Sequence, residues 1–144
     1  MGAIIDHIRA LESYIKRSGA RLVRATLPES VQGRVFSDHI TLRADLDSEQ
    51  QLLTLVHELA HWLAHRNAGR DAHCAACTIY EYEDEAVEAL VMARLGLPHP
   101  GQCPAHLSAY LSDDNPTDDL LPASVARVLS VSGRICDALG LQAG

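Results

Sequence analysis

A five-residue pattern constrains this chain more than any other feature, because residues 57–61 read His-Glu-Leu-Ala-His. Two histidines four positions apart project from one face of a helix and can bind the same metal ion. Zinc takes nitrogen or oxygen ligands at roughly 2.0–2.2 Å in a tetrahedral arrangement. A glutamate beside the first histidine can take a proton from a water activated by that metal. We therefore expect His57 and His61 to bind zinc and Glu58 to act as the general base.

The surrounding residues predict that the motif lies in a long helix. Asp47 or Ser48 fits the N-cap of a helix over residues 49–66, and Asn-Ala-Gly at 67–69 ends it. Apolar residues flank the motif on both sides, so Leu59 and Ala60 suit the buried face of the helix. A metal site explains this context better than the alternative, which is a helix whose two histidines are either satisfied by other partners or exposed.

A catalytic zinc ion usually has three protein ligands and keeps one position open for water. The extended motif HExxHxxGxxH cannot supply the third ligand, because Ala64 and Asn67 stand at the required positions. His65 is also excluded, since about 12 Å of helix rise separates it from His57. The remaining source is a carboxylate on the next predicted helix, and periodicity does not choose among its acidic residues, which are Glu81, Glu83, Asp84, Glu85 and Glu88.

The remaining patterns predict an α+β fold with one small sheet. Apolar periodicity predicts helices over residues 3–17, 49–66, 80–95, 104–111 and 122–139, and alternation predicts strands over 21–27, 33–36 and 39–44. This order favours a zincin-like domain in which a small antiparallel or mixed sheet packs on the motif helix and further helices follow. With 144 residues, the chain is expected to form a single domain over 1–144.

Charge and hydropathy limit the partners that this domain is expected to have. The net charge of −7 does not favour nucleic acid as a partner. No apolar stretch approaches the roughly 20 residues that span a bilayer. Residues 1–16 also lack the pattern of a secretory signal. We expect a cytoplasmic protein with no membrane partner.

Four cysteines, at positions 74, 77, 103 and 136, are expected to be reduced thiols in that compartment. Cys74 and Cys77 form a CxxC pair that follows His73. A second, structural metal bound with Cys103 or Cys136, or a redox switch, remains the alternative to simple thiols.

Residues 54–97 resemble the gluzincin-like metallopeptidases of the ImmA/IrrE and ArdC-like superfamily. The resemblance rests on Leu-Val-His-Glu-Leu-Ala-His at 55–61, Glu-Ala-Val-Glu-Ala-Leu-Val at 85–91 and Leu-Gly-Leu at 95–97. It implies one zinc ion per chain, with Glu85 as the third ligand. The chain departs from the ArdC-like pattern at Glu88, where that pattern has alanine. The segment 104–111 resembles the short helix that follows in ArdC-like domains.

The resemblance implies hydrolysis of peptide bonds in a protein substrate, with a regulatory protein as a second kind of partner. Tyr80, Tyr82 and Tyr110 are candidates for stabilising the oxyanion. The strand at 39–43 is expected to offer an edge to an extended peptide. The alternative function is a non-catalytic zinc-binding interaction module, such as a regulatory or anti-restriction factor of a mobile element.

Overall fold

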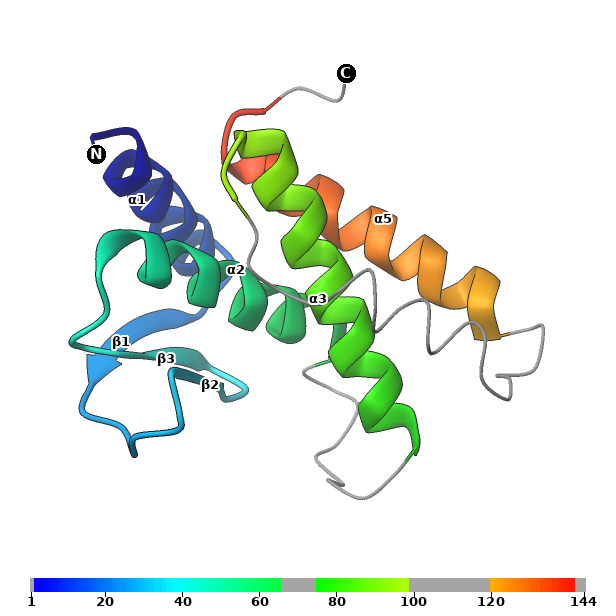
Figure 1. Ribbon diagram of the computed structural model, residues 1–144, viewed down its shortest axis with the longest axis horizontal. Coiled ribbons are helices and arrows are strands. Elements are labelled where there is room, and N and C mark those ends of the chain that lie inside the picture. Colours follow the sequence, from blue (N-terminus) through cyan, green and yellow to red (C-terminus); the bar gives the residue numbers. More distant parts are fainter. Residues whose placement is uncertain (1, 66–74, 99–119, 142–144) are drawn as a thin grey trace.

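The computed structural model describes residues 2–65, 75–98 and 120–141, with side chains over 2–64, 83–98 and 125–141. Within these residues the fold is α+β, as predicted, with a small mixed sheet (Figure 1). The helices and strands are α1 (Gly2–Arg17), β1 (Arg21–Ala25), β2 (Gly33–Val35), β3 (His39–Arg43), α2 (Ser48–His65), α3 (Ala75–Leu95) and α5 (Leu120–Ala138). No helix in the described part of the chain is long and apolar enough to cross a membrane.

The sheet has the strand order β1-β3-β2. β3 pairs in parallel with β1 and antiparallel with β2, with Ile40 opposite Leu22 on one side and Val35 on the other. The prediction that the strand at 39–43 offers a free edge is therefore wrong. Its residues Ile40 and Leu42 are fully buried, which explains why this strand takes the central position.

Helix α2 lies at the centre of the domain and contacts the other three described helices as well as β2 and β3. Asp47 is its N-cap, because the Gln50 backbone N–H donates to Asp47 Oδ1 at 2.8 Å, while the Asp47 N–H donates to Gln50 Oε1 at 3.3 Å. The core packs around this helix and includes the fully buried Leu52, Leu55 and Leu59. The helix that carries the motif is thus fixed from several sides.

Helices α3 and α5 pack against each other and against α2 (Figure 1). α3 starts five residues before the predicted position 80, because Ala75 and Ala76 are strong helix formers that extend it backwards. It ends at Gly96, whose φ of 72° and hydrogen bond to Ala93 O close the last turn.

Helix α5 begins at Leu120, two residues earlier than predicted. Pro122 falls in its first turn, where the backbone N–H has no partner within the helix and proline is tolerated. The predicted helix at 104–111 lies outside the described residues.

Candidate metal site

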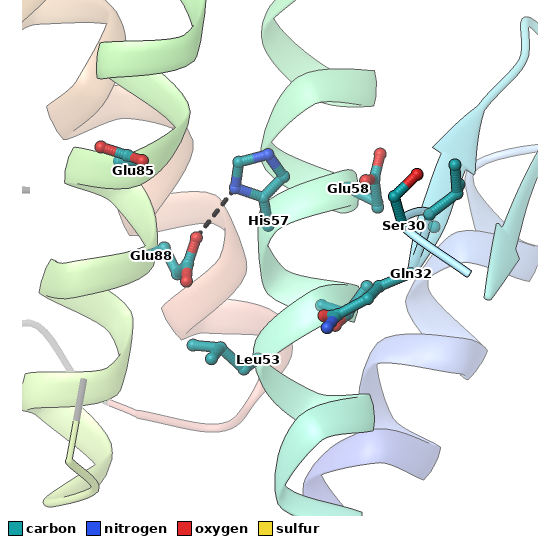
Figure 2. A pocket seen from close by; sticks show the side chains of 10 residues that line it. Ser30, Gln32, Leu53, His57, Glu58, Glu85 and Glu88 are labelled. Atoms are coloured by element: carbon teal, nitrogen blue, oxygen red, sulfur yellow. Dashed lines mark hydrogen bonds and ion pairs between the residues drawn. The ribbon is translucent and has the colours of Figure 1, made fainter. Parts of the chain in front are cut away.

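The motif residues lie on α2, at the level where this helix meets α3 (Figure 2). Leu59 and Ala60 are fully buried, as the apolar flanks of the motif predict. The side chains of His57 and His61 are 24% and 27% exposed, so the two rings remain partly open to solvent. This is the balance that a metal-binding helix needs, because its rear face is fixed in the core and its ligand face is accessible.

Each motif histidine pairs with a carboxylate of α3. His57 Nδ1 lies 2.8 Å from Glu88 Oε2, and His61 Nδ1 lies 2.9 Å from Asp84 Oδ2. From His57 to His61 the chain advances along α2, while the partner on α3 moves back from Glu88 to Asp84. The two helices are therefore antiparallel here. Both pairs keep a spacing of four residues on each helix, which lets one docking position satisfy both histidines.

These carboxylates determine which ring nitrogen a metal would meet. A histidine whose Nδ1–H donates to a carboxylate presents Nε2 to a metal, and such a partner also orients the ring. Asp84 is 1% exposed and Glu88 is 8% exposed, so both charges are held in the interior. Buried carboxylates require a hydrogen-bonded or cationic environment, which the histidines supply and a divalent cation would strengthen.

The residue types fit zinc, since two imidazoles and a carboxylate are a common ligand set of catalytic zinc sites. Among the side chains described, those of residues 2–64, 83–98 and 125–141, however, no three such groups stand close enough to hold a metal ion as they are now oriented. The fit therefore rests on the ring nitrogens and the donor chemistry rather than on a formed coordination sphere.

A cavity of about 500 Å³ opens beside His57, between α3 and the segment that leads into β2. Figure 2 shows His57, Glu85 and Glu88 on the α3 side of this cavity, with Glu58 and Ser30 on the opposite side. A carbonyl group and a water molecule could both be accommodated between these walls. The cavity is thus lined both by the motif histidine His57 and by Glu58, the proposed general base.

The acidic residues of α3 point towards different neighbours. Glu83 points to α5, where Arg127 Nε and Nη2 lie 2.6 and 3.0 Å from its two oxygens. Asp84 and Glu88 face the histidines, and the half-buried Glu85 lines the cavity.

The sequence indicated all four of these acidic residues as candidate ligands, but it did not indicate that Asp84 and Glu88 bond the motif histidines. The signal that could have revealed this pairing is the equal spacing of four residues between His57 and His61 and between Asp84 and Glu88.

Gly33 lies directly against Glu58, a proximity that the sequence did not reveal. A Cβ atom there would lie 2.9 Å from Glu58 Cγ, closer than real Cβ contacts allow. Glycine in β2 therefore lets the strand approach the proposed general base directly.

Several predicted residues lie outside the part of the chain whose side chains are described. These are His65, Glu81, the three tyrosines proposed for the oxyanion, Tyr80, Tyr82 and Tyr110, and the cysteines at 74, 77 and 103. Cys136 is described, and it is a buried free cysteine on α5.

The electrostatics of the site act most clearly on His57. Burial alone would lower the pKa of its imidazole, but the bond to Glu88 and the charges of Glu88, Glu58 and Asp84 outweigh burial and raise the pKa from 6.5 to about 9. The metal-free site thus favours a proton on His57 at neutral pH.

We expect the metal-free protein to lose stability as the pH rises. The protonated His57 stabilises the fold fully below pH 6.5, and this contribution is lost as the pH rises through about 9. One pKa unit corresponds to about 1.4 kcal/mol, so the rise from 6.5 to about 9 predicts a loss on the order of 3–4 kcal/mol. Urea unfolding of the metal-free protein at several pH values measures it. Glu88→Gln should flatten the dependence, and an unchanged profile in that variant would contradict the assignment.

Comparison with known proteins assigns the chain to a family. Residues 15–115 match the family model of the IrrE N-terminal-like domain, Peptidase_M78. No curated protein and no solved structure matches the chain. The matched residues include α2 and α3, and with them both His–carboxylate pairs.

Proposed function

Because the chain belongs to the family of the IrrE N-terminal-like domain, we propose that it is a zinc-dependent metallopeptidase that cleaves peptide bonds in a protein substrate. His57, His61 and Glu85 would hold the metal, and Glu58 would act as the general base. The observation that carries this proposal is the pairing of both motif histidines, through Nδ1, with carboxylates of α3. Carboxylate partners of this kind orient histidines in zinc sites and make them better ligands.

The positions of the neighbouring acidic residues support Glu85 as the third ligand. Glu83 forms a two-pronged ion pair with Arg127, and Asp84 and Glu88 bond the histidine rings. Glu85 lines the same cavity as His57 and Glu58.

The chemistry of the site combines the metal with one carboxylate of the chain. When bound, zinc lowers the pKa of water towards about 7 and polarises a carbonyl oxygen. Glu58 accepts a proton from the water that attacks the peptide carbonyl carbon. It then returns that proton to the nitrogen of the leaving amine as the C–N bond breaks. The cavity between Glu58 and His57 holds the two reactants next to each other.

We further propose that the substrate lies along β2 rather than along β3. β2 is an edge strand of the described sheet, and Gly33 at its start lines the cavity. An extended peptide that pairs with this edge would run past Glu58, and its backbone would supply most of the binding. Substrate specificity would then depend on the side chains of the peptide that enter the cavity.

The zinc content of purified protein tests the proposal. We expect about one zinc ion per chain in the wild type and a loss of that zinc in His61→Ala and Glu85→Ala, because each removes one of the three ligands. Elemental analysis of protein purified without added metal provides the measurement. His7→Ala is the matched control, since His7 lies on α1 and does not line the cavity beside His57, so this variant should retain the metal.

The outcomes separate the alternatives. Zinc that survives Glu85→Ala would show that another carboxylate is the third ligand. Zinc bound in full, without cleavage of any protein substrate, would favour the non-catalytic interaction module. A wild type that binds no zinc would contradict the proposed function itself.

A further inference from the structure

Arg127 on α5 forms an ion pair with Glu83 on α3. Its Nε lies 2.6 Å from Glu83 Oε1 and its Nη2 lies 3.0 Å from Glu83 Oε2, a two-pronged geometry across 44 positions of sequence. The Glu83 side chain is 5% exposed, whereas that of Arg127 is 37% exposed. The arginine therefore reaches from the surface to a carboxylate that is held inside the domain.

Glu83 is adjacent in sequence to the residues of the proposed metal site. Asp84, which bonds His61, and Glu85, the proposed ligand, follow it directly on the same helix. Successive helical residues are about 100° apart, so Glu83 and Asp84 face different neighbours. A rotation of α3 that moved Glu83 away from α5 would also turn Asp84 away from His61.

The ion pair between Arg127 and Glu83 also offsets the negative charge that is concentrated at residues 83–88 of α3. Glu83, Asp84 and Glu88 are three buried carboxylates within six positions of α3. Like charges this close repel one another, and a buried carboxylate that loses its partner is strongly unfavourable. The guanidinium of Arg127 offsets the charge of Glu83 with a planar group that matches carboxylate geometry.

We propose that Arg127 is a positioning residue of the metal site, which acts through its ion pair with Glu83 to hold α3 in the rotation that presents Asp84, Glu85 and Glu88. The proposal rests on the proposed zinc-binding function. α5 begins at Leu120, beyond the residues 15–115 that match the family. The chain thus completes its site with a contact from outside the matched region.

Zinc affinity in a double-mutant cycle tests this inference, with the full chain and a chromophoric chelator as competitor. Arg127→Leu should weaken zinc binding at least about 10-fold when Glu83 is present, and by no more than about 3-fold in a Glu83→Gln background, because the arginine acts through that carboxylate. Arg127→Lys keeps the charge but loses the fork, so it should fall between wild type and Arg127→Leu. Arg134→Leu is the matched control, since Arg134 is an exposed arginine on the same helix and should bind zinc as the wild type does.

The visible absorption of cobalt-substituted protein adds a readout that a change in stability alone would not move. The spectrum should shift in Arg127→Leu and stay unchanged in Arg134→Leu, because it reports the ligand geometry. If folded Arg127→Leu and Arg127→Lys both keep wild-type affinity and spectrum, the inference is wrong while the zinc site stands. If the wild type binds no zinc, the proposed function and this inference both fail. Should Arg127→Leu not fold, Arg127→Lys alone decides between these outcomes.

Discussion

Glu58→Gln should lose peptide hydrolysis by roughly 100- to 10,000-fold, the range that removal of a general acid–base group produces. The amide keeps the size of the side chain and its place beside the cavity, but it cannot accept the proton of the attacking water. Zinc content should stay at the wild-type level, because Glu58 is not one of the proposed ligands. Cleavage of a protein substrate, normalised to bound zinc, measures the effect.

The control for this variant is Glu49→Gln, which removes an exposed carboxylate in the first turn of the same helix. Activity there should remain within about 2-fold of the wild type, because surface substitutions away from special features change little. Hydrolysis retained in full by Glu58→Gln would rule out this residue as the general base.

Gly33→Ala should lower activity by roughly 100-fold without removing the metal, because a displacement of about 1 Å of a reacting group can have that effect. The added methyl would lie 2.9 Å from Glu58 Cγ and 3.2 Å from the backbone oxygen of Thr41. The strand oxygen cannot move freely, so the Glu58 side chain must shift instead. We also expect a loss of stability of about 1–3 kcal/mol, which is typical of overpacking.

Gly133→Ala provides a matched comparison, since an added Cβ there meets no atom within 4 Å. It lies in α5, where alanine is the better helix former, so stability should rise by up to about 1 kcal/mol and activity should not change. Activity, zinc content and urea midpoints of both variants give the comparison. Equal activity of Gly33→Ala and the wild type would contradict the close approach of β2 to the proposed base.

The parts of the fold that local pattern determines were predictable. The motif helix follows from periodicity and is confirmed, and of the two N-caps that the sequence allowed, Asp47 and Ser48, the structure shows Asp47. The three strands were found with ends displaced by one or two residues. The order of the strands was not predictable in the same way. A strand of five residues carries no local signal of whether it lies at the centre or the edge, and the edge assigned to β3 was wrong.

The site shows the same division between local and distant information. His57, Glu58 and His61 are recognisable because their chemistry needs a fixed spacing on one helix. The roles of the α3 carboxylates depend on how two helices dock, and periodicity within one helix does not contain that information. The contact between Arg127 and Glu83 was less accessible still, because it joins two helices across 44 positions of sequence and the local pattern of neither helix indicates it.

The pairing of the histidines with α3 has a consequence for how the domain folds. Each His–carboxylate pair takes one member from α2 and the other from α3, so neither pair exists in a chain whose helices are undocked. A cation that requires this arrangement binds the native state in preference to the unfolded ensemble. At a free concentration of 100 times its dissociation constant it would add about 2.7 kcal/mol to the free energy of unfolding. Metal supply in the cell would then set not only the activity of this domain but also the lifetime of its folded form.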